Sequence, residues 1–115
     1  MPYIRLVTTA DISPAQQQQL KSGLARATEL IPGKTESRLM LELDGGKVMF
    51  FQGEQRPLAY VDAKFSGPTD FADRARFTEA VFALCADVLA IPASSVYLTY
   101  TRFDEWGTGG ILKGR

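Results

Sequence analysis

The chain has 115 residues, of which 45% are hydrophobic and 23% are charged, as expected for one soluble globular domain spanning residues 1–115. Thirteen basic and thirteen acidic side chains balance, and no basic block supports binding to nucleic acid or an anionic membrane. The absence of histidine excludes serine–histidine and cysteine–histidine nucleophile pairs. There is neither a signal-peptide pattern nor an apolar run long enough for a membrane span, and the single cysteine, Cys85, can form no disulfide within the chain. These features predict a cytoplasmic protein with Cys85 in its core.

The first half of the chain predicts a strand, a helix and a second strand. Residues 2–9 alternate between two faces, as a strand does. The serine–proline pair at 13–14, with glutamine completing a capping box, begins a helix that ends at Pro32. Residues 38–44 alternate again, and the two glycines that follow predict a tight turn into a short hairpin strand at 48–51.

The second half repeats this order. Residues 58–65 predict a strand, and a serine, glycine and proline cluster at 66–70 precedes a strongly apolar helix that ends at Pro92. Residues 95–103 form the last long strand. The glycine-rich tail from Trp106 predicts a mobile loop with at most one short strand.

Two strand–helix–strand halves predict an α+β fold. Each half is a βαβ unit, and together they give a four-stranded mixed sheet with both helices on one face. The other face is left open. We expect it to carry enough apolar side chains, Phe65 among them, to pack against other subunits.

The residue with the clearest chemical potential is Pro2. A small residue at this position favours removal of Met1, which would leave a secondary amine at the N-terminus. An α-amine titrates near pH 7.7–8.0, and burial or a nearby cation lowers its pKa further. Such an amine is suited to general-base catalysis. The alternative is a terminal proline that only opens a strand.

Several short motifs, in this order and spacing, resemble the tautomerase superfamily and its macrophage migration inhibitory factor branch. They are Met1-Pro2, Gly33-Lys34 after the first helix, and Ile91-Pro92 followed by the strand at 96–100. The resemblance covers nearly the whole chain. It implies a homotrimer in which three sheets form a barrel with the helices outside, and an active site around each terminal proline at a subunit boundary.

The resemblance also implies roles for individual residues. Pro2 would be the catalytic base, while Lys34 and the backbone amide of Phe65 would hold a substrate carboxylate. Tyr97 and Thr99 would line the pocket from the neighbouring subunit, although Thr99 replaces the asparagine of mammalian members. Phe103 and Trp106 would form an aromatic wall. Each of these side chains also has an ordinary structural explanation, such as packing or a solvated helix end.

These features predict a keto–enol tautomerase that acts without cofactor or metal on a small α-keto acid such as phenylpyruvate. One alternative is a binding or signalling protein that keeps the fold without the chemistry. Another is a dehalogenase or decarboxylase of the same superfamily, for which Arg74 and Arg76 invite comparison. Their spacing on a predicted helix does not place them on one face, however.

Overall fold

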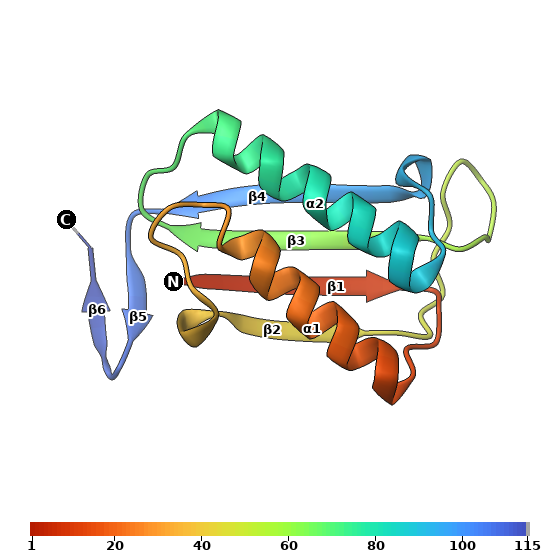
Figure 1. Cartoon of the computed structure of the whole chain (residues 1–115), viewed down its shortest axis with the longest axis horizontal. Helices are drawn as coiled ribbons and strands as arrows, with labels where there is room; N and C mark the ends of the chain where they lie inside the picture. Colours follow the sequence, from red (N-terminus) through yellow and green to blue (C-terminus); the bar gives the residue numbers. More distant parts are fainter. Residues whose placement is uncertain (115) are drawn as a thin grey trace.

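A four-stranded mixed sheet lies at the centre of the computed structural model, which describes residues 1–114 (Figure 1). Its strand order is β2-β1-β3-β4. The strands are β1 (Pro2–Thr8), β2 (Met40–Asp44), β3 (Ala59–Ser66) and β4 (Val96–Phe103). β1 pairs with β2 and β3 pairs with β4 in parallel, whereas β1 and β3 are antiparallel. This topology confirms the predicted pair of βαβ units.

Both long helices, α1 (Pro14–Thr28) and α2 (Phe71–Leu89), cover the same face of the sheet (Figure 1). The predicted capping box at the start of α1 is present, with the Ser13 hydroxyl accepting from the backbone of Gln16. α2 ends at Ala90, which adopts the left-handed conformation just before Pro92. Two short 3-10 turns, η1 (Glu36–Arg38) and η2 (Ala93–Ser95), lead into β2 and β4.

The core lies between the sheet and the helices. Phe65 is fully buried there, with its ring edge-on to Phe77 of α2 at 5.5 Å between centroids and stacked on Tyr100 at 4.9 Å. Cys85 of α2 is also buried, as predicted, and burial raises the pKa of its thiol to about 11. The prediction that Phe65 faces the open side of the sheet is therefore wrong. The face of β3 that carries Val61, Ala63 and Phe65 is the one that the helices cover.

The open face of the sheet is mainly polar, contrary to expectation. Arg5 of β1 pairs with Glu42 at 3.1 Å and with Asp44 at 2.7 Å on β2. On β3, Lys64 pairs with Asp62 at 2.5 Å. These ion pairs occupy the part of the open face that β1, β2 and β3 form.

The predicted hairpin strand at 48–51 does not form, and only an isolated bridge joins Phe51 to Glu54. After β2 the chain turns over the end of β1, where the Lys47 amide donates to the Thr8 carbonyl at 3.0 Å. The segment therefore leaves the sheet without a strand partner in its own chain. Its side chains remain outside the core, with Val48 77% and Phe50 66% exposed.

The tail is a second, small sheet and not the predicted loop. β5 (Trp106–Thr108) pairs antiparallel with β6 (Ile111–Lys113). Gly109 and Gly110 join them with φ of +60° and +84°, the positive values that a tight two-residue hairpin turn requires. The hairpin lies at the end of the sheet where the chain begins (Figure 1). Within residues 1–114, no helix is long and apolar enough to cross a membrane.

Candidate active site

The amino terminus lies at one end of the sheet, beside a pocket of about 560 Å³. Pro2 is buried and begins β1, an inner strand of the sheet, where it pairs with Phe65. The pocket is lined by Met1, Pro2, Tyr3, Ser37, Arg38, Leu39, Met40, Trp106, Gly107 and Thr108. It is therefore walled by β1, by η1 with the start of β2, and by β5 of the terminal hairpin.

The terminal amino group is in an environment that disfavours its charged form. It is partly buried, and its hydrogen-bond partner is the hydroxyl of Ser66 at 3.3 Å. Burial first, and then the positive charges of Lys34 and Arg38, hold the pKa of the Met1 amine below its ordinary value.

Lys34 reaches this amino group from the loop after α1. Gly33 adopts a φ of +82°, which turns the chain, and the Lys34 amide donates to the Ile31 carbonyl at 3.1 Å. The Lys34 ammonium donates to the carbonyl oxygen of Ser66 at 2.7 Å. Lys34 and the amino terminus thus meet at the end of β3.

Ser66 connects the amino terminus to this lysine. Besides accepting from the amino group, Ser66 donates its own backbone N–H to the Met1 carbonyl at 3.2 Å. Removal of Met1 would leave that N–H without its acceptor. Phe65, one residue earlier, pairs with Pro2 but directs its side chain into the core.

The two aromatic residues of the predicted wall touch each other. The rings of Phe103 and Trp106 lie 6.0 Å apart in an edge-to-face arrangement. Trp106 lines the pocket, whereas Phe103 is not among its lining residues and accepts a hydrogen bond from the Gly67 amide at 3.0 Å.

Tyr97 and Thr99 are not brought to Pro2 of their own chain. Pro2 aligns through Phe65 with Arg102, so Tyr97 lies five residues and Thr99 three residues further along β4. At about 3.3 Å per residue these offsets are about 17 and 10 Å. Tyr97 is 64% exposed, and the Thr99 hydroxyl is hydrogen-bonded to Tyr60 at 2.5 Å.

Arg74 and Arg76 make local contacts near the start of α2. Arg74 donates to the Thr69 carbonyl at 2.6 Å and lies over the Tyr100 ring, and Arg76 pairs with Asp73. Neither residue lines the pocket at Pro2.

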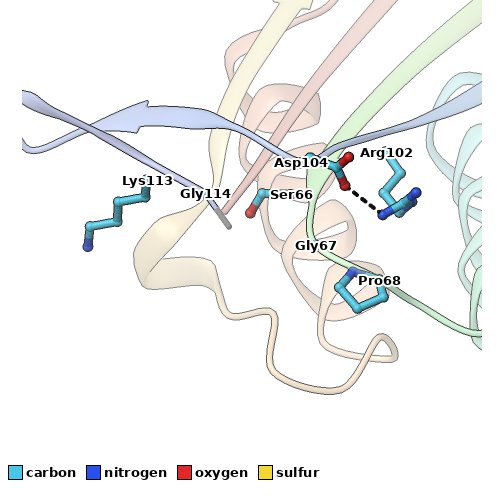
Figure 2. Close-up of a pocket in the computed structure, with 7 residues that line it drawn as sticks. All are labelled: Ser66, Gly67, Pro68, Arg102, Asp104, Lys113 and Gly114. Atoms are coloured by element: carbon cyan, nitrogen blue, oxygen red, sulfur yellow. Dashed lines mark hydrogen bonds and ion pairs between the residues drawn. The ribbon is translucent and has the colours of Figure 1, made fainter.

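A second hollow of about 470 Å³ is lined by Ser66, whose hydroxyl also accepts from the amino terminus. Figure 2 shows its lining, in which Arg102 is paired with Asp104 at 3.0 Å. Lys113 comes to this hollow from β6 and points away from that ion pair (Figure 2). Pro2 lines the first hollow and is not among the lining residues of the second.

Two residues at this site were missed by the sequence analysis, Arg38 and Ser66. Arg38 follows Lys34 by four positions in a polar loop, and the only sequence signal for it was this second cation after the helix. Ser66 directly follows the expected Phe65 and carries no sequence signal of its own, since the pairing of β3 with β1 brings it to the amino terminus. No group of three or more His, Cys, Asp or Glu residues that could hold a metal occurs within residues 1–114.

Known proteins share this fold over almost the full chain. A homologue of macrophage migration inhibitory factor from Brugia malayi is 29% identical over 107 residues, covering 90% of each chain. The crystal structure of Leishmania major MIF2 matches with a TM-score of 0.91 at 21% identity, covering 98% of this chain and 97% of that one. Pt0534, crystallised after inactivation by 2-oxo-3-pentynoate, matches with a TM-score of 0.80 at 20% identity, covering 94% and 93%. The model of the macrophage migration inhibitory factor family matches residues 1–112, and this chain belongs to that family.

Proposed function

We propose that the protein is a cofactor-free keto–enol tautomerase that acts on small 2-oxo acids such as phenylpyruvate, with the Pro2 amine as general base. The observation that carries the proposal is the buried Pro2, which opens an inner strand beside a pocket that Arg38 also lines, next to the Met1 amine on which Lys34 acts. The inactivation of Pt0534 by 2-oxo-3-pentynoate supports this substrate class, because that compound is itself a 2-oxo acid.

The proposed reaction moves one proton. The neutral amine of Pro2 takes a proton from the carbon next to the ketone and leaves an enolate, whose oxygen then receives the proton to give the enol. The substrate carboxylate would bind the Lys34 ammonium and the Ser66 N–H that the Met1 carbonyl now occupies. We therefore assign to Ser66 the amide role that the sequence suggested for Phe65.

The complete site would need a second copy of the chain. Since Tyr97 and Thr99 lie too far along β4 to reach Pro2 in one chain, we propose that they enter the pocket of a neighbour in a homotrimer. Support comes from the apolar side chains near Tyr97. Phe51 contacts the Tyr97 ring edge-on at 4.9 Å, and the exposed Phe50 lines a hollow with both of them.

The Pro2→Gly variant is expected to lose at least about tenfold in kcat/KM for phenylpyruvate tautomerisation. Glycine keeps an N-terminal amine but lacks the ring that fixes its position, and general-base catalysis depends on that position. Ultraviolet absorbance of the enol provides the rate, and N-terminal mass confirms that Met1 is absent from both samples. Equal rates for the native protein and the Pro2→Gly variant would contradict the proposal.

Lys34→Gln is expected to raise KM for phenylpyruvate about tenfold or more, because a hydrogen bond to a charged group contributes about 1.5–3 kcal/mol. The same substitution should also move the acid limb of the pH profile of kcat/KM to higher pH. Removing a cation stabilises the protonated amine, so the pKa of Pro2 rises and its basic form appears only at higher pH. The control is Lys47→Gln, which removes the same charge where the chain passes the other end of β1. Unchanged KM and pH limb in the Lys34 variant would contradict this role.

A binding protein without catalysis is the second candidate, and retention of Met1 would favour it. In the chain that retains Met1, the Pro2 nitrogen is part of an amide and the Met1 carbonyl occupies the Ser66 N–H. N-terminal mass of protein taken from cells decides between them. Retained Met1 supports binding, and its loss supports the enzyme. A cytoplasmic location and a single domain remain predictions from the sequence.

A further inference from the structure

Arg38 presents an unpaired positive charge to the pocket at Pro2. It ends η1, where its backbone N–H donates to the Thr35 carbonyl at 3.2 Å. Its exposed side chain makes no hydrogen bond or ion pair within residues 1–114. Tyr3 is the one other ionisable side chain among the lining residues.

The acidic side chains around Arg38 have other partners. Glu36, in the same short turn, pairs with Lys21 of α1 at 3.4 Å. Glu42 of β2 accepts the Tyr3 hydroxyl and pairs with Arg5 at 3.1 Å. No carboxylate within residues 1–114 therefore neutralises the Arg38 guanidinium, which remains available to an anion that enters the pocket.

Lys34 supplies the first cation beside the amino terminus, and Arg38 supplies a second from the wall of the pocket. Lys34 is held by the Ser66 carbonyl at the end of β3, whereas Arg38 projects from the turn before β2. A guanidinium binds a carboxylate through two parallel hydrogen bonds, which fixes its orientation as well as its position. Two cations that approach the amino terminus from different segments of the chain fit a ligand that carries one anionic group at each end.

We propose that Arg38 binds a second carboxylate and that the protein prefers 2-oxo dicarboxylates to 2-oxo monocarboxylates of the same length. This assignment rests on the proposed function, in which Lys34 takes the carboxylate next to the ketone. Arg38 is then a specificity-determining residue. A pocket of about 560 Å³ is large enough for a five-carbon diacid.

The test uses two keto acids that differ only at the far end. In 2-oxoglutarate that end is a carboxylate, and in 2-oxopentanoate it is a methyl group. Trp106, the single tryptophan, lines the pocket, so its fluorescence reports binding to protein lacking Met1. Deuterium exchange at carbon 3, followed by NMR, reports catalysis separately. The variants are Arg38→Gln and the charge-retaining Arg38→Lys, with Arg26→Gln on the exposed end of α1 as the matched control.

The native protein should bind 2-oxoglutarate at least about tenfold more tightly than 2-oxopentanoate, since a charged hydrogen bond contributes about 1.5–3 kcal/mol. In Arg38→Gln the affinities for the two acids should differ by no more than about twofold, and Arg38→Lys should keep part of the preference. Arg26→Gln should leave it unchanged. Because both acids are measured on the same variant, any effect of Arg38 on the Pro2 amine changes both affinities alike and drops out of their ratio.

Equal affinities of the native protein for the two acids, or a ratio that survives in Arg38→Gln, would overturn the assignment. Catalysed exchange with no effect of Arg38 on the ratio would overturn this inference alone. The expected binding ratios without catalysed exchange would support Arg38 as the second carboxylate site and overturn the tautomerase proposal instead.

Discussion

Protein that retains Met1 is expected to tautomerise 2-oxo acids at least about 100-fold more slowly than protein that begins at Pro2. General-base catalysis contributes about 10²–10⁴-fold, and an amide nitrogen cannot act as a base. The structure adds a second reason. The Met1 carbonyl accepts the Ser66 N–H at 3.2 Å, so the retained residue also occupies a donor proposed for the substrate.

One preparation can serve as its own control. Rates and N-terminal mass are measured before and after treatment with methionine aminopeptidase, so that only the first residue changes. Activity should rise in proportion to the fraction of chains that begin at Pro2. A preparation that is fully active while its mass still includes Met1 would contradict the role of Pro2.

Phe77→Ala is expected to lower the free energy of unfolding by about 3–5 kcal/mol, the usual effect of removing a buried aromatic ring. Phe77 is completely buried and meets Phe65 and Tyr100 edge-on, at 5.5 and 6.3 Å between ring centroids. Its loss would leave a cavity under α2 next to the strand that pairs with Pro2.

Phe71, on the same helix, provides the matched control because 76% of it is exposed. Phe71→Ala should change the free energy of unfolding by less than about 1 kcal/mol, since surface substitutions rarely do more. Urea unfolding of both variants at one fixed protein concentration gives the comparison. Similar losses for Phe71 and Phe77 would mean that the aromatic cluster does not hold α2 to the sheet.

The strands and helices of the four-stranded sheet could be predicted because their signals are local. Ser13 and Gln16 complete a capping box in sequence and in structure, and alternation identified β1 and β3. The repeated order of elements then limited the topology to two right-handed βαβ units.

The errors arose where a partner outside the local segment decides the structure. Alternation showed that Phe65 and Ala63 share a face but could not show which face the helices cover. The segment at 48–51 has the composition of a strand but finds no edge to pair with in its own chain. In the tail, Gly109 and Gly110 indicated flexibility, whereas their positive φ values form the hairpin turn.

The site was predicted in part, for a related reason. Lys34 could be located because it follows a clear helix end, and the structure places it at the amino terminus. Ser66 and Arg38 could not, because only strand register and the path of η1 bring them there. Tyr97 and Thr99 lie along the sheet from Pro2, so their proposed role depends on an assembly of several chains.

The most direct test of the account compares two pKa values in one protein. NMR titration of the ¹⁵N-labelled Pro2 amine, in protein lacking Met1, gives the pKa of that group. The acid limb of kcat/KM gives the pKa of the essential base in the free enzyme. We predict that the two coincide and lie below the usual 7.7–8.0 of an α-amine, because Pro2 is buried next to the Met1 amine, whose pKa is lowered by burial, Lys34 and Arg38. A kinetic pKa that differs clearly from the titration of Pro2 would show that another group is the base.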